Sequence, residues 1–386
     1  MRAAVVGAGA WGLPAAAELA RRGHDVHLVE AYGLGHGFGS SSGETRLWRL
    51  SHPETSMVRL AQRAVDAWRD VEARSGRALL LTRGLLWRGD SAPAVADALA
   101  AEGVSHERVG SADVARWFPG LRANGEDAVW QADAGPVLAA DSLRAHADLL
   151  FAADGQLLAG HRVVGIDVGS DDDCVRLSLD GSTADLTVDV VVLAPGPWAV
   201  DLLPLLSVDL VLQPVLEQVV HFDGPPGWVD LPCLYDAPTR DDVGLYAMPA
   251  PGVGYKVGLD LPLRAFATGD LDRTPDPGRA AAASARVSRD FTALRPHALS
   301  SQVCTWTMSP DGRFVIDRLH GGRVVLACGD SGTGFKFSAL MGHLLADQAE
   351  GRAVDADVAA FGLARFAGGL PEQPPYHVFG TGHEGP

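Results

Sequence analysis

Apolar runs that alternate with a helical pattern fill the first thirty residues of the chain. Residues 3–6 form a short apolar run ending in two valines, which predicts a buried strand. Residues 13–22 are rich in alanine and predict a helix, and residues 26–30 predict a second strand after a turn. This order of elements is typical of an α/β fold with a parallel sheet.

The same pattern returns near the C-terminal end. Residues 314–317 and 324–328 predict strands, a glycine-rich loop follows at 329–337, and residues 338–350 predict a helix. The run 190–193 is so apolar that it predicts a strand buried on both faces, as in a parallel sheet. The domain that contains this α/β sheet is therefore expected to be assembled from separated pieces of the chain.

The intervening segments are more varied. The apolar spacing predicts helices at 55–75, 92–103, 111–117, 140–153 and 278–294. Strands are predicted at 78–87 (with a glycine break), 161–168, 174–179 and 184–188, and a loop at 131–138. From 212 to 261 the pattern alternates between apolar and polar positions, which is typical of antiparallel strands.

These patterns predict an α/β chain of two domains. The first is a Rossmann-like dinucleotide-binding domain, and the second is a substrate domain built on a mainly antiparallel sheet. The expected ranges are 1–80, 138–212 and 310–386 for the first domain, and 81–137 with 213–309 for the second.

A glycine motif lies between the first strand and the first helix. Gly7, Gly9 and Gly12 have the spacing G-x-G-x-x-G, and Glu30 ends the second strand. The glycines allow a tight turn, close approach of the main chain to a pyrophosphate, and close packing of helix on strand. The helix N-terminus favours phosphate, and an acid at this place accepts hydrogen bonds from ribose hydroxyls. The motif, with Ala10 and Trp11 inside it, predicts a dinucleotide site and leaves NAD and FAD open.

Composition excludes several classes of protein. The 386 residues are 47% hydrophobic and 21% charged, as in ordinary globular proteins. A net charge of −16 argues against a nucleic-acid partner. No apolar stretch is long enough for a membrane span, and the first strand begins so early that no signal peptide is expected, which predicts a cytoplasmic protein. The four cysteines are irregularly spaced and predict neither disulfides nor a metal site.

Basic residues add two clues. Among 32 basic residues, only Lys256 and Lys336 are lysines, so the chain retains a compact ammonium at just two places. Arg46 and Arg49 follow a segment rich in glycine and serine, and they would share one face if residues 43–49 were helical.

Taken together, the chain resembles the sarcosine oxidase family of flavin amine oxidases, within the D-amino-acid oxidase-like superfamily. The matching segments are spread over nearly the whole chain in the family's order: 7–30, 43–49, 194–198, 246–258, 304–307 and 329–337. The resemblance implies FAD as the cofactor. It also implies cofactor contacts at Ser42, Thr45, Arg46, Val163, Ala194, Gly196, Trp198, Gly332, Gly334, Phe335 and Lys336.

The resemblance also implies residue roles. Cys304 falls where the monomeric family members attach flavin through a thioether. Arg49 and Lys336 are similar to the pair that grips the substrate carboxylate. Arg46 resembles an arginine close to the flavin ring, and Lys256 a lysine that helps oxygen react with reduced flavin.

Three further positions concern the substrate cavity. Tyr246 resembles a residue that lines it. Trp306 stands where sarcosine oxidases carry a tyrosine, and Asp260 where they carry a histidine. An Asp can pair with a substrate cation, so a larger or cyclic secondary amino acid, or an amine intermediate of specialised metabolism, is as plausible as sarcosine.

The sequence therefore predicts a monomeric flavoprotein without a metal. Its expected reaction oxidises a C–N bond of a secondary amino acid to an imine, and molecular oxygen becomes hydrogen peroxide. Two alternatives stay open. One is a flavin dehydrogenase with another electron acceptor, and the other is an NAD(P)-binding dehydrogenase or a nucleotide-binding protein without redox turnover.

Overall fold

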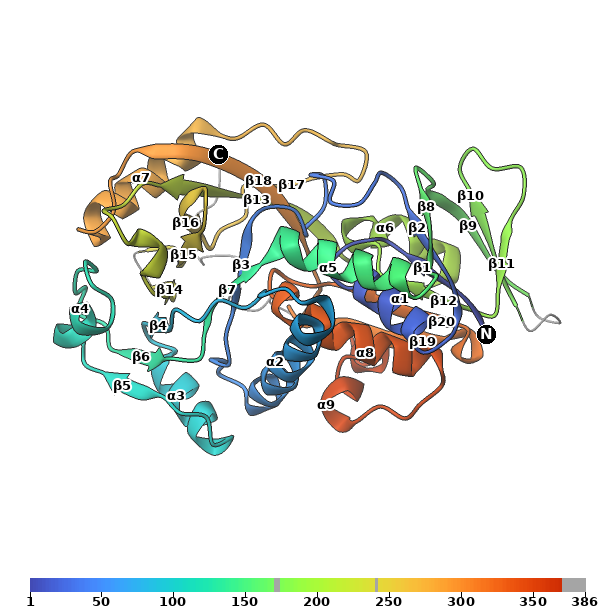
Figure 1. The fold of residues 1–386 in the computed structure, drawn as a ribbon, viewed down its shortest axis with the longest axis horizontal. Coiled ribbons are helices and arrows are strands. Elements are labelled where there is room, and N and C mark those ends of the chain that lie inside the picture. The colour runs from blue at the N-terminus through green and yellow to red at the C-terminus, as the bar shows by residue number, and fades with distance from the viewer. Residues whose placement is uncertain (170–173, 240–241, 370–386) are drawn as a thin grey trace.

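The structure is a computed structural model that describes residues 1–169, 174–239 and 242–369. Two large sheets dominate it and lie side by side in Figure 1. The residues 370–386 assigned above to the first domain lie outside the described part.

The first large sheet has six strands and is mostly parallel. Its strands lie in the order β19 (Val315–Leu319), β20 (Val324–Cys328), β12 (Val190–Leu193), β1 (Arg2–Val6), β2 (Asp25–Glu30) and β8 (Gln156–Ala159). Only the pair β19–β20 is antiparallel. The central strands are buried on both faces, which is why their sequences are continuous apolar runs.

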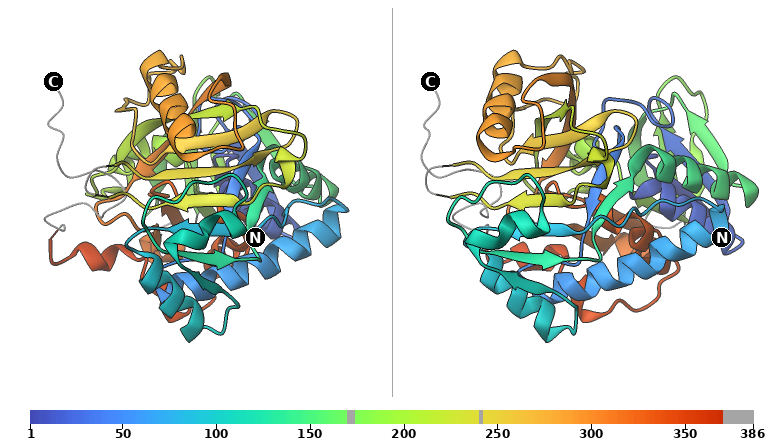
Figure 2. Two further views of the ribbon diagram at one scale, coloured as in Figure 1. Left: turned by 90° about the vertical axis from the view of Figure 1, so that its left-hand side faces the viewer. Right: turned by 60° about the vertical axis from the view of Figure 1, so that its left-hand side comes forward.

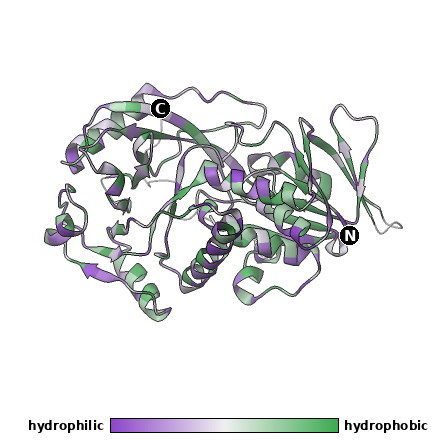
Figure 3. Ribbon diagram, viewed as in Figure 1, coloured by the Kyte–Doolittle hydropathy of each residue, from purple (hydrophilic) through white to green (hydrophobic). Residues whose placement is uncertain are grey.

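Helices cover one face of this sheet and a smaller sheet covers the other. The helices are α1 (Gly12–Arg21), α2 (Thr55–Ser75), α5 (Ala139–Ala152) and α8 (Ser338–Ala349), which pack on one another. The smaller sheet consists of β9 (Val163–Val168), β10 (Val175–Leu179) and β11 (Leu186–Val188), and α6 (Ala199–Leu202) packs beside it. In Figure 3, α2 alternates between hydrophilic and hydrophobic stripes, as expected of a helix with one buried face.

The second large sheet has nine strands and is mainly antiparallel. They are β17 (Arg264–Ala265), β13 (Gln213–Phe222), β16 (Gly254–Leu259), β15 (Leu245–Ala250), β14 (Cys233–Asp236), β4 (Leu85–Arg88), β6 (Ala128–Gln131) and β5 (Glu107–Val109), with β18 (Ala298–Met308) along β13. Only β14 and β4 run parallel. Helix α7 (Pro277–Asp290) packs on one face of this sheet, as Figure 2 shows. Helix α4 (Val114–Trp117) belongs to the same hydrophobic cluster as α7, α3 (Ala92–Ala101) packs against β6, and α9 (Ala356–Ala359) follows α8.

The predicted α/β class with a Rossmann-like sheet and a mainly antiparallel second sheet is confirmed. The six-stranded sheet takes its strands from the three ranges expected for the first domain, and the nine-stranded sheet from the other two. The domain boundaries themselves stay a prediction. No helix within the described residues is long and apolar enough to cross a membrane.

Two local expectations were wrong, and the condition under which Arg46 and Arg49 would share a helix face is not met. Residues 43–49 contain a strand, β3 (Thr45–Trp48), because they pair with β7 (Gly135–Leu138) from a distant part of the chain. Residues 131–138 are consequently strand ends around a short turn rather than one loop. The strand expected at 78–87 is confined to its second half as β4, since a single bridge at Leu80 is all the pairing in its first half.

Candidate active site and cofactor cleft

A cavity of about 850 Å³ extends between the two large sheets. Every residue predicted above as catalytic or cofactor-binding lines it, except Gly12 and Thr45, which are buried directly beside it. The structure therefore brings together residues from both ends and the middle of the chain.

The glycine loop lies at the end of strand β1, and steric contacts explain two of its glycines. A Cβ at Gly7 would lie 2.4 Å from the main-chain oxygen of Ala194, and Gly7 has φ = 97°. A Cβ at Gly12 would lie 2.0 Å from the oxygen of Gly7. A Cβ at Gly9 would meet only the Ser41 hydroxyl, at 3.1 Å. Gly7 therefore lets the segment after β12 approach the loop, Gly12 lets α1 pack close to β1, and Gly9 keeps its main chain open to the cavity.

Groups around this loop suit a dinucleotide. Both oxygens of the Glu30 carboxylate accept main-chain N–H bonds, from Ala8 at 2.8 Å and Tyr32 at 2.9 Å. These bonds fix the carboxylate at the cavity wall and leave it lone pairs for ribose hydroxyls. The Ser41 hydroxyl accepts from the N–H of Ala10 at 2.9 Å. Helix α1 starts here with no acidic residue in its first turn, so its positive end faces the cavity uncompensated.

Arg46 is fixed by main-chain oxygens from the preceding segment. Its guanidinium donates to Ser40 at 2.7 Å, Ser42 at 2.6 Å and Thr45 at 2.9 Å, and it lies 5.6 Å from the ring centre of Phe335. Because β3 is extended, Arg46 and Arg49 do not share a helix face as expected. They still both reach the cavity.

Lys256 is buried on strand β16 and donates to the main-chain oxygen of Thr45. Burial, followed by the nearby charge of Arg46, lowers the pKa of Lys256 to about 7. The amine is therefore poised between its charged and neutral forms near neutral pH.

The predicted carboxylate clamp also consists of buried cations. Arg49 stacks on Trp87 at 4.5 Å from its ring and donates to the main-chain oxygen of Ser51. Lys336 donates to the oxygen of Thr333 at 2.8 Å. Burial lowers the pKa of Arg49 to about 10, and burial with the charge of Arg49 lowers the pKa of Lys336. Two like charges that disfavour each other in a buried site form a suitable receptor for an anion.

Acidic and phenolic groups lie opposite these cations. The hydroxyl of Tyr235 donates to the carboxylate of Asp260 at 3.1 Å. The charges of both groups raise the pKa of Arg49, but the effect of burial is larger. Tyr246 covers Gly258, where a Cβ would lie 2.2 Å from its ring. The glycine thus lets the tyrosine lie flat on the sheet at the cavity wall.

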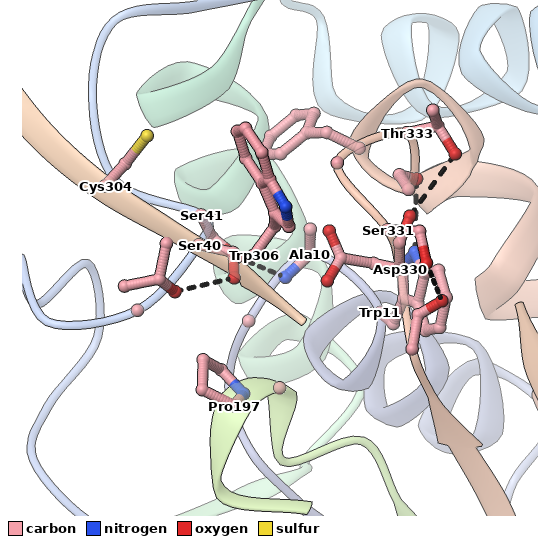
Figure 4. A pocket seen from close by; sticks show the side chains of 18 of the residues that line it. Ala10, Trp11, Ser40, Ser41, Pro197, Cys304, Trp306, Asp330, Ser331 and Thr333 are labelled. Atoms are coloured by element: carbon pink, nitrogen blue, oxygen red, sulfur yellow. Dashed lines mark hydrogen bonds between the residues drawn. The ribbon is translucent and has the colours of Figure 1, made fainter. Parts of the chain in front are cut away.

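Strand β18 brings two of the predicted residues to the cavity. Cys304 and Trp306 are two positions apart and project from the same strand in Figure 4, with Asp330 on the glycine-rich loop opposite. All four cysteines of the chain are free. Burial raises the pKa of Cys304, and Arg46 opposes this most strongly. Trp306 donates to the sulfur of Met308 at 2.9 Å.

Sequence reasoning missed several site residues. Tyr235, Ser41 and Trp87 carry no local signal, because their roles depend on which strand lies beside them. Asp330 lies in the loop 329–337 that the sequence singled out, but the sequence did not identify this residue as part of the site. Burial raises its pKa to about 6, and it accepts from the N–H of Thr307 at 3.0 Å.

The residues present fit FAD. The hydroxyls of Ser42 and Thr45 are buried beside the cavity without a hydrogen-bond partner in the described part of the chain. Together with the open main chain at Gly9 and the fixed Glu30 carboxylate, they provide polar groups along the cleft that Cys304 also lines. Among the described residues, no group of three or more His, Cys, Asp or Glu side chains could hold a metal ion.

The fold and the cleft define a flavin-dependent oxidoreductase. The model of the family "FAD dependent oxidoreductase" (DAO) matches residues 2–348, and the chain belongs to this family. FAD, rather than NAD, is therefore the dinucleotide, and the predicted kinship with sarcosine oxidases is confirmed.

Several relatives match over nearly the whole chain. Monomeric sarcosine oxidase from Bacillus sp. (strain B-0618) is 27% identical, over 94% of this chain and 95% of its own. N-methyl-L-tryptophan oxidase from Escherichia coli O17:K52:H18 is 26% identical over 94% and 98%. Among solved structures, NikD, an amino acid oxidase of nikkomycin biosynthesis, has a TM-score of 0.82 at 24% identity, covering 93% of this chain and 96% of its own. That last likeness concerns the fold.

Proposed function

We propose that this enzyme oxidises a secondary amino acid at the C–N bond to an imine, with molecular oxygen as the electron acceptor and hydrogen peroxide as the second product. The single observation that carries the proposal is that Arg49 and Lys336, close enough for the charge of Arg49 to lower the pKa of Lys336, line the same cavity as Lys256 and Cys304. FAD bound in the cleft supplies the two-electron acceptor.

Arg49 and Lys336 hold the substrate carboxylate. A carboxylate between them relieves the repulsion of the two buried cations, so binding is favoured electrostatically as well as by charged hydrogen bonds. Fixing the carboxylate leaves the amine nitrogen and its neighbouring carbon in one orientation. The proposed reaction needs no side chain to remove a proton from the carbon next to nitrogen. The residues that contact the substrate are therefore proposed only to bind and orient it.

Lys256 makes the protein an oxidase in this proposal. A cation held in place before the reaction stabilises the negative charge that develops when oxygen accepts an electron. Its bond to Thr45 fixes the ammonium, and no side-chain reorganisation is required at the moment of reaction.

Cys304 carries the flavin through a thioether in this proposal. Its side chain reaches the same cavity as the glycine loop, and Arg46 and Lys256 both favour its thiolate form. Cys174 and Cys233 do not line the cleft. Cys328 lines it, but the cation that acts most on its pKa is Arg365 rather than Arg46 or Lys256.

The substrate is expected to be larger than sarcosine. Asp260 and Tyr235 form a polar wall near Arg49, which suits a hydrogen-bond donor or a cation on the substrate beyond its α-carboxylate. Trp306 adds a large ring at the cavity wall.

A peroxide assay across N-methyl and cyclic amino acids tests the function. The expected result is peroxide formation with at least one secondary amino acid and much slower formation with its carboxamide. Oxidation that proceeds with an artificial dye while oxygen yields no peroxide would assign the enzyme to the dehydrogenases.

A further inference from the structure

A buried carboxyl group beside Cys304 has no role in the function described so far. Glu217 on strand β13 is 0% exposed, and neither of its carboxyl oxygens has a hydrogen-bond partner within the described residues. The nearest cation is Arg279, whose Nη1 lies 3.9 Å from Oε1 of Glu217. That guanidinium already donates to the oxygens of Leu261 at 2.6 Å and Pro262 at 3.0 Å.

The register of the sheet places this group next to the thiol. Glu217 is directly opposite Cys304 in the antiparallel pair of β13 and β18. Side chains at opposite positions project to the same face with their Cβ atoms about 5 Å apart. The neighbouring pairs on this face are Val219 with Gln302 and Val215 with Trp306, and Val219, Gln302 and Trp306 line the cavity. Glu217 therefore lies on the cavity side of the sheet, covered by the groups in front of it.

A buried, unpaired carboxyl costs stability, so its retention at this position needs a reason. A structural ion pair does not supply it, because Arg279 is too distant for a hydrogen bond and is engaged elsewhere. A hydrophobic residue of similar size would fill the same place without that cost. What the position offers is a proton acceptor adjacent to a cysteine.

We propose that Glu217 accepts the thiol proton of Cys304 when the thioether to the flavin forms. The inference rests on the covalent attachment in the proposed function. The Sγ–H bond breaks as the bond from Sγ to a methyl carbon of the isoalloxazine forms. That methyl loses one hydrogen, two electrons pass to the flavin, and oxygen restores its oxidised state as hydrogen peroxide. In total, thiol, flavin methyl and O2 give thioether and H2O2.

The charges around the pair support a transfer of this direction. Burial raises the pKa of Glu217 well above that of an ordinary glutamate, which makes its ionised form a stronger base. Arg46 and Lys256 lower the pKa of Cys304, so the thiolate left behind has two cations near it. Once Glu217 is protonated, its own charge no longer opposes the thiolate.

Titration of Glu217 takes place among charged neighbours on four elements. Arg279 of α7 favours its ionised form, whereas Asp260 after β16 opposes it. Tyr246 of β15 and Cys304 of β18 are neutral acids that face the same side. Formation of the thioether is therefore expected to accelerate as the pH rises through the ionisation of Glu217.

The test uses the full-length chain produced under riboflavin limitation and then supplied with FAD. The rate of covalent incorporation is read from flavin fluorescence of the protein band in a denaturing gel, at several pH values. Glu217→Gln is expected to bind FAD, seen as quenching of its fluorescence, but to form the thioether about 100-fold more slowly and without the rise with pH. Glu217→Asp should restore part of the rate, and Cys304→Ser should give no fluorescent band.

Two results overturn the inference in distinguishable ways. A Gln variant that couples at the wild-type rate contradicts the role of Glu217 and leaves the thioether intact. A wild-type protein without a fluorescent band contradicts the thioether itself and the inference with it. If the Gln variant does not bind FAD, the Asp variant provides the test. Its carboxyl group is one methylene further from Cys304, so the thioether must form more slowly, and an unchanged rate contradicts the role of Glu217.

Discussion

The ammonium of Lys256 donates a hydrogen bond to the main-chain oxygen of Thr45, and this bond connects the nine-stranded sheet to strand β3 at the cavity wall. The same oxygen accepts from Arg46 at 2.9 Å. One carbonyl therefore holds two cations, and the pKa of Lys256 falls to about 7 through burial and its neighbour Arg46. The position of strand β3 therefore affects the charge of the lysine that we propose for the reaction with oxygen.

Lys256→Met is expected to slow reoxidation of the flavin by oxygen by about 100-fold while leaving its reduction by substrate nearly unchanged. The reason is that negative charge develops near the ammonium only during reoxidation. Stopped-flow absorbance of the two half-reactions separates them. In the wild type, reoxidation should be fastest where Lys256 is protonated and should decline as the pH rises through about 7. Lys256→Arg is the charge-retaining control. A Met variant that reoxidises at the normal rate would remove this role.

Arg49→Ala and Lys336→Ala are each expected to weaken binding of carboxylate substrates by about 2 kcal/mol, the usual scale for a lost charged hydrogen bond. Steady-state kinetics should show this as a raised KM for the amino acid. The corresponding amide, which lacks the negative charge, should be a poor substrate for the wild type and should lose little more in the variants. Equal losses for acid and amide would reject the clamp.

Gly12→Ala is expected to destabilise the protein and abolish FAD binding, since the added Cβ would lie 2.0 Å from a main-chain oxygen that cannot withdraw. Gly9→Ala is the matched variant. Its Cβ meets only a serine hydroxyl at 3.1 Å, so the chain should fold but bind FAD less tightly. Thermal unfolding and flavin content measure the two effects. A Gly9 variant as unstable as the Gly12 variant would show that Gly9, too, is needed for packing.

Asp330→Asn is expected to stabilise the enzyme at high pH. Burial raises the pKa of Asp330 from 3.8 to about 6, so the folded state holds this proton more tightly than the unfolded state does. Its contribution is fully present below pH 3.8 and is lost as the pH rises towards 6, at a cost of roughly 3 kcal/mol. The Asn variant should therefore melt above the wild type at pH 8, with a smaller difference at pH 5. The same difference at both values would contradict this assignment.

The sequence predicted those elements whose own periodicity determines them. Helix α2 begins and ends where its amphipathic pattern does, and strand β12 was visible as a continuous apolar run. Strand β3 was not, because its conformation comes from pairing with β7, some ninety residues further along the chain. The hydrophobic pattern of a short segment does not indicate which distant strand it will pair with.

The site divides in the same way. The glycine loop and Cys304 stand in motifs that could be read along the chain, and the structure brings them to one cavity. The bond between Tyr235 and Asp260 joins strand β14 to the residue that follows β16, and the neighbours of these strands were unknown. Glu217 had no motif at all. Its proximity to Cys304 follows only from the register of β13 and β18.

One spectrophotometric experiment tests the central claim most directly. The purified protein is mixed without oxygen with each of a panel of N-methyl and cyclic amino acids, and its flavin absorbance is followed before and after air is admitted. An amino acid oxidase predicts that the absorbance bleaches with the amino acid and returns with air, yielding one peroxide for each amino acid oxidised. A flavin that stays oxidised with every such amino acid, or that bleaches but does not recover with oxygen, would contradict the account.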